Sequence, residues 1–342
     1  MSFIIADVAL QKEKAIPVPE GGNQLNPEAV RVNASARLHL GFLDLGGDLG
    51  RRFGSLGLAV EGFETRIEMR WGRRFAAKGA EAERVAGLVR RLTETHRAEG
   101  EVEVDVASAI PAHAGLGSGT QLALGLALAF RRLHRLPEDP EADAAALMRG
   151  ARSGIGVGLF RQGGFMLDAG RGASTALPPI VSHLPFPGDW RVVLLIDDEV
   201  EGAHGEAERA AFAALPPFPA TSAAEICHRA LMQVLPGVAE ADFAAFGAGI
   251  SAIQRRLGDH FAPAQGGGRF TSRRVGEVAA ALERAGALGV GQSSWGPTGF
   301  VFAPDPEVAA GWAARAREAG RGKLRVQICA ARARGAQCVS LP

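Results

Sequence analysis

Apolar and polar residues alternate in three stretches of the first half of the chain. Residues 30–40 alternate strictly, which is the period of a half-buried β-strand, and residues 65–71 and 101–106 predict two further strands. Between the first two strands, the glycine-rich residues 41–57 are expected to form a loop. The pattern therefore predicts a sheet built from the first hundred residues.

Two other stretches follow a helical pattern. Residues 80–98 have one apolar face and predict an amphipathic helix. Residues 121–133 are apolar almost all round, which is typical of a buried helix. We expect this second helix to lie inside the domain and the first to cover its surface.

The second half of the chain predicts another domain. Residues 177–188 contain four prolines and indicate a linker, and residues 191–197 predict a short buried strand beyond it. Helices are expected near 221–235, 238–257 and 273–286, and a strand–helix–strand ending at 299–303, 306–319 and 324–329. The irregular alternation favours an α+β fold with a peripheral extension over 1–30 and domains over 31–187 and 188–342.

Composition excludes several classes of protein. The 38 basic and 37 acidic residues give a net charge of +1, so no overall field attracts nucleic acid or an anionic membrane. The chain has no tyrosine, and its three cysteines form no CxxC pair, which suits a reducing compartment. No apolar run is long enough to span a membrane. At the N-terminus the basic residues follow the short apolar stretch, whereas in a signal peptide they precede it. We expect a cytoplasmic protein.

The strongest candidate site is a glycine-rich segment between a predicted strand and the buried helix. Its glycines let backbone N–H groups converge at a helix N-terminus, an arrangement suited to phosphate. A glycine-rich turn that only allows tight helix packing is the alternative. The segment is not a P-loop, because it has no lysine. The candidate phosphate-binding residues here are His113, Gly115, Leu116, Gly117, Ser118, Gly119, Thr120 and Gln121.

A second cluster follows the first strand. Alternation places Arg37 and His39 on one face, and Phe42 and Asp44 follow in the loop. This group could bind phosphate, carboxylate or metal, or it could be a solvated strand face.

A third patch contains Arg152 and Ser153 beside glycines, a candidate for binding oxyanions or a solvated helix end. Asp168, at the end of a predicted strand, could face a site or form a turn.

A late Gly/Ser loop carries Ser293, Ser294 and Trp295. The indole could stack on a ligand ring and the hydroxyls could bond to it. The alternative is a tight hairpin with the tryptophan packed inward.

Taken together, these segments resemble the GHMP superfamily and, within it, the β-ribofuranosylaminobenzene 5′-phosphate synthases. The resemblance covers roughly residues 30–340. The similar runs are Arg37-Leu-His-Leu-Gly-Phe-Leu-Asp44, Phe53-Gly-Ser-Leu-Gly-Leu58, His113-Ala-Gly-Leu-Gly-Ser-Gly-Thr-Gln121, Arg152-Ser-Gly-Ile-Gly156, Gly163-Gly-Phe165 and Gly291-Gln-Ser-Ser-Trp-Gly-Pro-Thr298.

The resemblance implies an N-terminal domain like the second domain of ribosomal protein S5 and a ferredoxin-like C-terminal domain. It implies a homodimer that uses Mg²⁺ in tetrahydromethanopterin biosynthesis. The implied reaction joins phosphoribosyl pyrophosphate and 4-aminobenzoate into a C-riboside 5′-phosphate, with release of CO₂ and pyrophosphate. The superfamily's kinases place a catalytic Asp in the region corresponding to residues 152–164, where this chain has no carboxylate.

Roles follow from the implied reaction. Arg37 and Arg152 are expected to bind phosphate oxygens, and the ring of Trp295 or Phe42 to stack on the aromatic substrate. Asp44 or Asp168 would hold the metal, with Ser118, or face the sugar cation; His39 or His113 would bond to the amine or to phosphate. An ATP-dependent small-molecule kinase and a non-catalytic ligand-binding relative remain the alternatives.

Overall fold

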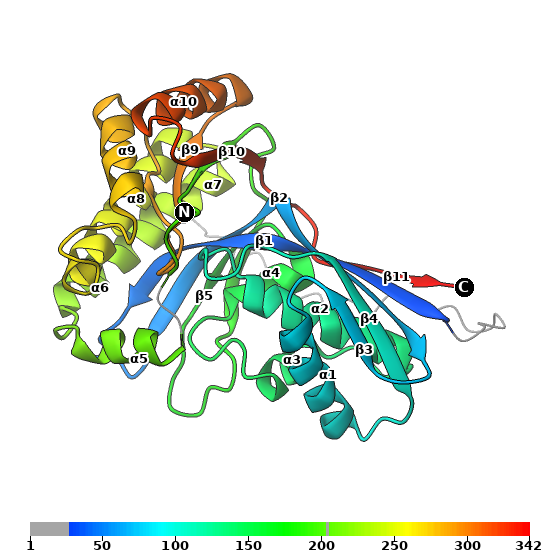
Figure 1. Cartoon of the computed structure of the whole chain (residues 1–342). Helices are drawn as coiled ribbons and strands as arrows, with labels where there is room; N and C mark the ends of the chain where they lie inside the picture. The colour runs from blue at the N-terminus through cyan, green and yellow to red at the C-terminus, as the bar shows by residue number, and fades with distance from the viewer. Residues whose placement is uncertain (1–26, 203–204) are drawn as a thin grey trace, which may run out of the picture.

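The computed structural model describes residues 27–202 and 205–342. The predicted extension over 1–30 therefore lies almost wholly outside the described residues. The described residues form two lobes, each built on a mostly or wholly antiparallel sheet with helices packed against it (Figure 1).

The first lobe contains a seven-stranded sheet in which β11-β1-β2-β4-β3 are consecutive neighbours and β5 and β6 extend from β2. Its strands are β1 (Ala29–Asp44), β2 (Phe53–Gly72), β3 (Ala76–Gly79), β4 (Glu101–Ser108), β5 (Phe165–Asp168), β6 (Ile180–Leu184) and β11 (Gln337–Leu341). The expected loop over 41–57 is wrong in extent, because β1 continues to Asp44 and β2 already begins at Phe53.

Four helices accompany this sheet: α1 (Ala82–His96), α2 (Ser118–Leu133), α3 (Pro140–Ala146) and α4 (Ile155–Gln162). As predicted, α2 is buried along almost its whole length and contacts both β1 and β2. Helices α1, α3 and α4 each contact α2, and α4 also packs against β1 and β2. The start of α2 is therefore held in place by the core of the lobe.

The second lobe contains a four-stranded antiparallel sheet in the order β10-β7-β9-β8. Its strands are β7 (Arg191–Ile196), β8 (Gly291–Gln292), β9 (Gly299–Ala303) and β10 (Arg325–Ala330). Its helical segments are α5 (Gly205–Ala214), α6 (Ala220–Arg229), η1 (Ala230–Val234), α7 (Leu235–Ala239), α8 (Phe243–Phe261), η2 (Ala262–Ala264), α9 (Arg273–Arg284) and α10 (Pro306–Ala319). The predicted strand–helix–strand ending is confirmed as β9, α10 and β10.

Helix starts in the second lobe follow from N-caps that the sequence carries. The side chains of Asp242, Ser272 and Asp305 each accept a hydrogen bond from a backbone N–H in the first turn of α8, α9 and α10. These acceptors satisfy N–H groups that have no partner within the helix. The three caps therefore mark the starts of α8, α9 and α10.

Two predicted boundaries need correction. The proline-rich segment 177–188 contains strand β6, because its prolines flank residues 180–184 and leave the strand's own N–H groups in place. The last strand, β11, pairs with β1 in the first lobe, so the second domain does not extend unbroken to residue 342. Strand β11 is an edge strand of the first sheet and lies beside the start of β1 (Figure 1).

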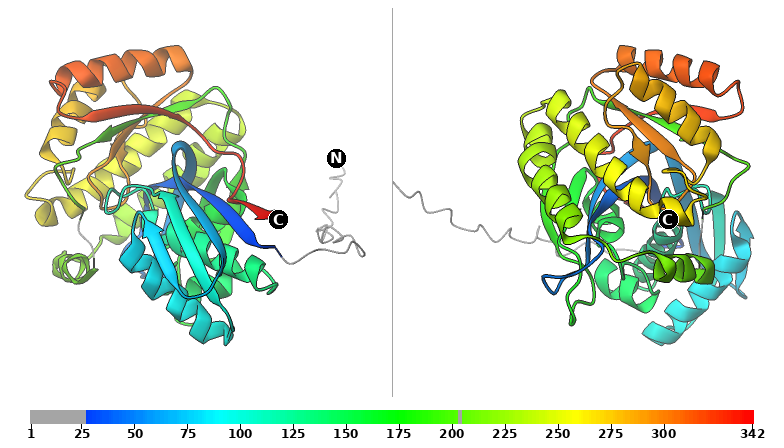
Figure 2. Two further views of the ribbon diagram at one scale, coloured as in Figure 1. Left: turned by 45° about the vertical axis from the view of Figure 1, so that its right-hand side comes forward. Right: turned by 90° about the vertical axis from the view of Figure 1, so that its left-hand side faces the viewer.

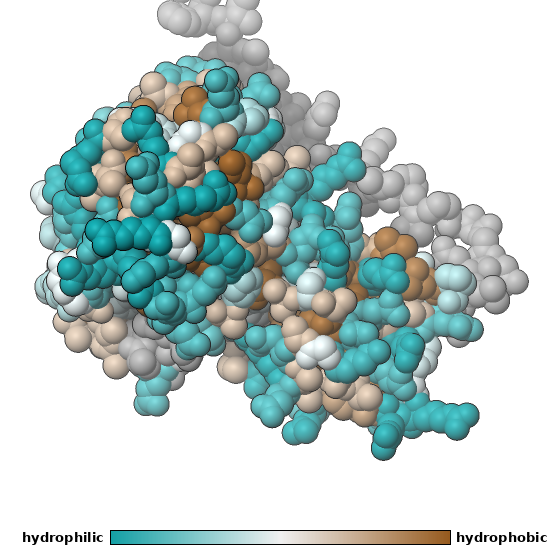
Figure 3. All heavy atoms as spheres, turned by 45° about the horizontal axis from the view of Figure 1, so that its top comes forward, coloured by the Kyte–Doolittle hydropathy of each residue, from teal (hydrophilic) through white to brown (hydrophobic). Residues whose placement is uncertain are grey.

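The lobes share a continuous core. The far half of β1 packs against α6 and α8 of the second lobe, and one cluster of buried apolar residues contains side chains from both lobes. The two views of Figure 2 show the second lobe resting on the end of the long strands β1 and β2. In Figure 3 the hydrophobic residues of one face lie among hydrophilic ones. No helix in residues 27–202 or 205–342 is long and apolar enough to cross a membrane.

Candidate active site

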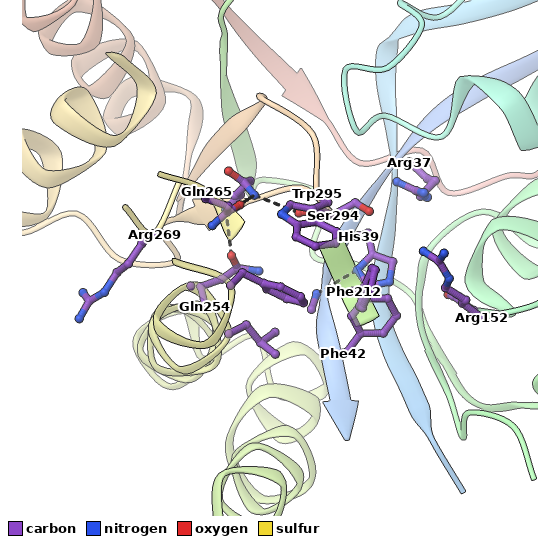
Figure 4. Close-up of a pocket in the computed structure, with 16 residues that line it drawn as sticks. Arg37, His39, Phe42, Arg152, Phe212, Gln254, Gln265, Arg269, Ser294 and Trp295 are labelled. Carbon is purple, nitrogen blue, oxygen red and sulfur yellow. Dashed lines mark hydrogen bonds between the residues drawn. The ribbon is translucent and has the colours of Figure 1, made fainter. Parts of the chain in front are cut away.

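A cavity of about 180 Å³ lies where the lobes meet. Four aromatic rings from β1, α5, α8 and the 292–298 loop form much of its wall, namely Phe42, Phe212, Phe261 and Trp295. The indole of Trp295 lies 4.6 Å from the ring of Phe212 and 5.0 Å from that of Phe261, between ring centroids. Phe42 and Trp295, the two rings that the sequence offers for stacking on an aromatic substrate, both line this cavity (Figure 4).

His39 points into this cavity from β1 and is 3% exposed. Its Nδ1 accepts a hydrogen bond from the N–H of Gly41 at 3.3 Å, which places the imidazole proton on Nε2. Burial, with a smaller effect of the Arg37 charge, lowers the pKa of His39 to about 3. Nε2 is buried without a partner in the described structure. His39 is therefore a neutral N–H donor available to a ligand.

Two arginines line the same cavity on one side of the aromatic rings (Figure 4). The guanidinium of Arg152 lies 4.7 Å from the ring centroid of Phe212. Arg37 donates from Nη1 to the carbonyl of Gly115 at 2.8 Å, and burial lowers its pKa to about 10. Arg37 therefore stays charged at neutral pH, and the structure places both residues predicted to bind phosphate in one cavity.

The predicted phosphate loop lies directly beside Arg37. The N–H of Arg37 donates to the carbonyl of Leu116, and a Cβ on Gly117 would lie 2.9 Å from the Arg37 side chain. Gly115 and Gly117 have φ values of 82° and 81°, which glycine adopts without strain. Residues 117–120 remain partly accessible, and in the described structure no protein acceptor is bonded to the N–H groups of Gly117, Ser118 or Gly119. The loop keeps the free amides that an anion needs.

Within that loop, three side chains do not face a ligand. Leu116 is fully buried in the core, and Gln121 is 1% exposed and donates to the carbonyl of Gly156. The side chain of Thr120 faces Gly156 at the start of α4. The side chains of Leu116 and Gln121 therefore hold the bend in shape, and the contacts predicted for the loop are those of its backbone N–H groups. His113 is exposed with a φ of 56°, and its carbonyl accepts from the N–H of Gly202.

The 292–298 loop is bonded to both other parts of the site. Ser293 is fully buried, donates to the carbonyl of Gly115 at 2.7 Å and accepts from the N–H of His39 at 3.1 Å. Ser294 donates its backbone N–H to the carbonyl of His39 at 3.1 Å and lines the cavity. The prediction that Ser293 contacts substrate is therefore corrected, because its hydroxyl joins the phosphate loop to β1.

The two glycine loops also touch backbone to backbone. A Cβ on Gly296 would lie 2.4 Å from both the nitrogen and the Cα of Gly115, closer than real Cβ contacts. We predict that Gly296→Ala lowers kcat/KM by about tenfold, since displacing catalytic groups by an ångström has effects of this order or larger. Steady-state kinetics of the purified variant measures the loss.

A matched control for this variant is Gly87→Ala. Gly87 is exposed in α1 and its Cβ would meet nothing within 4 Å, so alanine should leave activity unchanged. Equal activity of Gly296→Ala and Gly87→Ala would show that the contact between the loops does not position the site.

Asp168 has a structural place that differs from its predicted catalytic role. Its carboxylate is 0% exposed; Oδ2 accepts from the hydroxyl of Ser153 and the N–H of Gly154, both at 3.0 Å, and Oδ1 from the N–H of Gly170 at 2.8 Å. Burial raises its pKa despite these bonds. Asp168 therefore anchors the Arg152–Ser153 turn, and the Ser153 hydroxyl is engaged there instead of with phosphate.

We predict that Asp168→Asn lowers the free energy of unfolding by about 1–3 kcal/mol, because an amide NH₂ would face a backbone N–H donor. Denaturant unfolding followed by circular dichroism gives this difference. Asp189→Asn, at an exposed carboxylate, is the control and should unfold like the wild type. A fully stable Asp168→Asn would mean that the turn does not depend on this carboxylate.

The predicted metal pair, Asp44 and Ser118, is not brought together. Arg37 lies beside the phosphate loop, and Asp44 is seven residues further along β1, roughly 20 Å away at ~3.3 Å per residue. Oδ1 of Asp44 accepts the N–H groups of Gly46 and Gly47 and closes a turn. Across residues 27–202 and 205–342, no three His, Cys, Asp or Glu residues cluster as a metal site would need. The residues around the loop do not fit a resident Mg²⁺.

Sequence reasoning missed several cavity residues on the helices of the second lobe. Phe212 and Phe261 lie on amphipathic helices, whose apolar faces carry no mark that separates a cavity wall from a core. Gln254 donates to the carbonyl of Leu40 and accepts from the N–H of Gln292, and Gln292 donates to Gln265. These amides fix the wall opposite the arginines. No local sequence motif identifies these glutamines as cavity-lining residues.

The chain is similar in sequence to a family of known proteins. The family model described as GHMP kinases N terminal domain matches residues 82–164, and the one described as GHMP kinases C terminal matches residues 234–322. The chain is 34% identical to beta-ribofuranosylphenol 5′-phosphate synthase of Archaeoglobus fulgidus over 237 residues, 66% of this chain and 75% of that protein. It is 29% identical to the protein of the same name from Methanothermobacter thermautotrophicus over 288 residues, 78% of this chain and 86% of that one.

Solved structures share the fold. A homoserine kinase from Cytophaga hutchinsonii superposes with a TM-score of 0.68 at 19% identity, covering 92% of this chain and 99% of that one. A complex of MDDEF with MVAPP, AMPPCP and magnesium gives a TM-score of 0.63 at 15% identity, covering 91% and 99% of the two chains. At these identities the likeness concerns the arrangement of the elements, and it confirms the predicted two-domain α+β class.

Proposed function

Because the chain belongs to the beta-ribofuranosylphenol 5′-phosphate synthase family of the GHMP kinase superfamily, we propose that it joins phosphoribosyl pyrophosphate to 4-aminobenzoate in methanopterin biosynthesis. The family and superfamily are those that the sequence runs predicted. The names differ only in the para substituent of the product ring, a hydroxyl in one and an amine in the other.

One observation carries the proposal: an aromatic cavity and a free-amide phosphate loop meet at Arg37. The cavity offers stacking surfaces of Trp295 and Phe42 to a benzene ring. The loop offers unbonded amides at the positive end of the α2 dipole, with Arg37 in contact with Gly117. A substrate pair made of one aromatic acid and one phosphorylated sugar fits this combination.

In the proposed reaction, the C1–O bond of the sugar breaks and its electron pair leaves with pyrophosphate. The para amine makes the ring carbon that bears the carboxylate electron-rich, and this carbon bonds to C1. The bond to the carboxylate then breaks, CO₂ leaves, and that electron pair restores the aromatic ring. Loop amides and arginines stabilise the negative charge that develops on the leaving oxygen.

The cavity also suits the loss of CO₂. A carboxylate held by a strong cationic clamp would resist decarboxylation, whereas a dry aromatic site destabilises the charged form. Arg269, at the far side of the cavity, is already paired with Asp259 at 2.5 Å. His39 brings an N–H donor without a positive charge. The wall formed by Gln254, Gln265 and Gln292, opposite Arg37 and Arg152, therefore brings no free cation to the acid.

This proposal gives Mg²⁺ a different role from the protein-bound metal that the sequence resemblance implied. The two predicted metal carboxylates are engaged elsewhere, Asp44 in its own turn and Asp168 with Ser153, Gly154 and Gly170. We therefore propose that Mg²⁺ enters only as a counterion of the diphosphate substrate. A resident protein-bound ion is not part of the proposal.

An ATP-dependent kinase is disfavoured by the same geometry. Residues 152–164 contain no carboxylate, and the nearest one along the chain, Asp168, is buried and fully bonded. No general base for a substrate hydroxyl is therefore present at that position.

The test is to incubate the purified protein with phosphoribosyl pyrophosphate, 4-aminobenzoate and Mg²⁺, and to measure the riboside product together with CO₂ and pyrophosphate. A parallel reaction with 4-hydroxybenzoate decides which para substituent is used. Equal amounts of the three products are expected. Binding of phosphoribosyl pyrophosphate without products, or ATP-dependent phosphorylation in their place, would overturn the proposal. Light scattering on the same sample counts the subunits of the predicted homodimer.

A further inference from the structure

A second group of cations meets the phosphate loop on another side. Arg84 and Arg91 lie seven residues apart on α1 and therefore on one face of that helix. Arg149 comes from the turn after α3. A Cβ on Gly119 would lie 2.5 Å from Nη2 of Arg84 and 3.5 Å from Nη1 of Arg149. We call Arg84, Arg91 and Arg149 the outer arginine cluster.

The outer arginine cluster carries uncompensated positive charge. Arg84 is paired with Glu81 at 3.3 Å, but the described part of the chain holds no hydrogen-bonding or ion-pair partner for the guanidinium of Arg149. Nε of Arg149 is buried without a partner, and burial together with the charges of Arg84 and Arg91 lowers its pKa. A buried, unbonded donor next to like charges is unfavourable unless an anion joins them.

This cluster is separate from the cavity. Arg37 contacts the loop at Gly117, whereas Arg84 and Arg149 contact it at Gly119, in the first turn of α2. Gly117 is the residue before α2 and Gly119 lies within it, so the two contacts flank Ser118. None of the three arginines lines the aromatic cavity. Cations thus lie on both sides of the free amides of the loop.

The stereochemistry of the reaction distinguishes the two sides. The relatives are named for a β-riboside, and phosphoribosyl pyrophosphate carries its diphosphate on the α face. The attacking ring and the leaving group must then lie on opposite faces of the sugar. The 5′-phosphate projects from the β face, on the same side as the attacking ring. With the ring in the aromatic cavity, the 5′-phosphate falls near Arg37 and Arg152.

We propose that the outer arginine cluster binds the departing pyrophosphate, with the amides of Ser118 and Gly119, while Arg37 and Arg152 hold the 5′-phosphate. This inference rests on the proposed function for its assignment of the two phosphate groups. Pyrophosphate carries the larger charge, and the cluster brings three guanidiniums against one neighbouring carboxylate, that of Glu81. The arginines themselves neutralise the leaving group.

The experiment measures binding of two probes separately by calorimetry, inorganic pyrophosphate and ribose 5-phosphate. Arg149→Gln and Arg84→Gln are expected to weaken pyrophosphate binding by about tenfold or more and to change ribose 5-phosphate binding little. Arg152→Gln should do the reverse. Arg91→Gln, at an exposed position, gives a smaller loss in a variant whose folding is not at risk. Arg90→Gln, an exposed neighbour on α1, is the matched control and should change neither.

The outcomes separate the two proposals. If the wild type makes no riboside but the cluster variants lose pyrophosphate selectively, the cluster stands and the reaction falls. If riboside forms and the cluster variants lose ribose 5-phosphate instead, or lose neither probe, the cluster assignment is overturned and the reaction stands.

Discussion

Replacing Arg37 by alanine is expected to lower kcat/KM for riboside formation by about 10²-fold, because the guanidinium orients the phosphorylated sugar for attack and misplacing a substrate costs this much. The guanidinium lines the cavity, contacts the loop at Gly117 and donates to the carbonyl of Gly115. Its loss removes a cation from the junction between the two substrates. CO₂ release under conditions of limiting phosphoribosyl pyrophosphate measures the effect.

Two further variants separate charge from geometry in this prediction. Arg37→Lys keeps the charge but not the planar fork, so only part of the activity should return. Arg31→Ala, on the same strand but exposed and paired with Glu68 at 2.8 Å, should retain wild-type activity. An Arg37→Ala enzyme within threefold of the wild type would remove Arg37 from the site.

The parts of the fold that follow from local patterns were predictable. The period of residues 30–40 and the apolar stretch at 121–133 correspond to β1 and α2, and the glycines between His113 and Gly119 mark the bend before α2. The first half of β2 was not predictable. Its glycines indicate a loop, but Gly57 is needed because the side chain of Ile155 lies against it, with Cδ1 only 2.5 Å from a Cβ at that position.

Some residues of the site were likewise predictable from the sequence and others were not. Arg37, His39 and Trp295 stand in conspicuous runs, and the structure brings all three to one cavity. The local sequence around a carboxylate at the end of a strand does not show whether it faces a ligand or accepts backbone N–H groups. Only the three bonds to Asp168 decide that question. The outer arginine cluster joins Arg84 and Arg91 to Arg149, which lies 65 and 58 positions further along the chain, and that proximity depends on how α1 and α3 pack around α2.

The second large effect is expected at His39. His39→Phe keeps a ring in the cavity but removes the Nε2–H donor, and should lower kcat/KM by about 100-fold. His39→Gln, whose amide can donate from a similar position, should recover most of that loss. Because the pKa of His39 is lowered to about 3, the imidazole stays neutral throughout the working range. The wild-type kcat/KM should therefore show no inflection from His39 between about pH 5 and pH 8.

The same pKa makes a stability prediction with a definite sign. In the unfolded chain His39 titrates near 6.5, and in the folded chain near 3. As the pH falls below 6.5, the unfolded state binds a proton that the folded state does not, so the free energy of unfolding decreases until about pH 3. Above 6.5 this contribution is constant. Urea unfolding across that range should show a steeper acid loss in the wild type than in His39→Gln. Equal slopes, or an activity inflection near 6.5 that His39→Gln abolishes, would mean that the folded imidazole takes up a proton and cannot be the neutral donor described here.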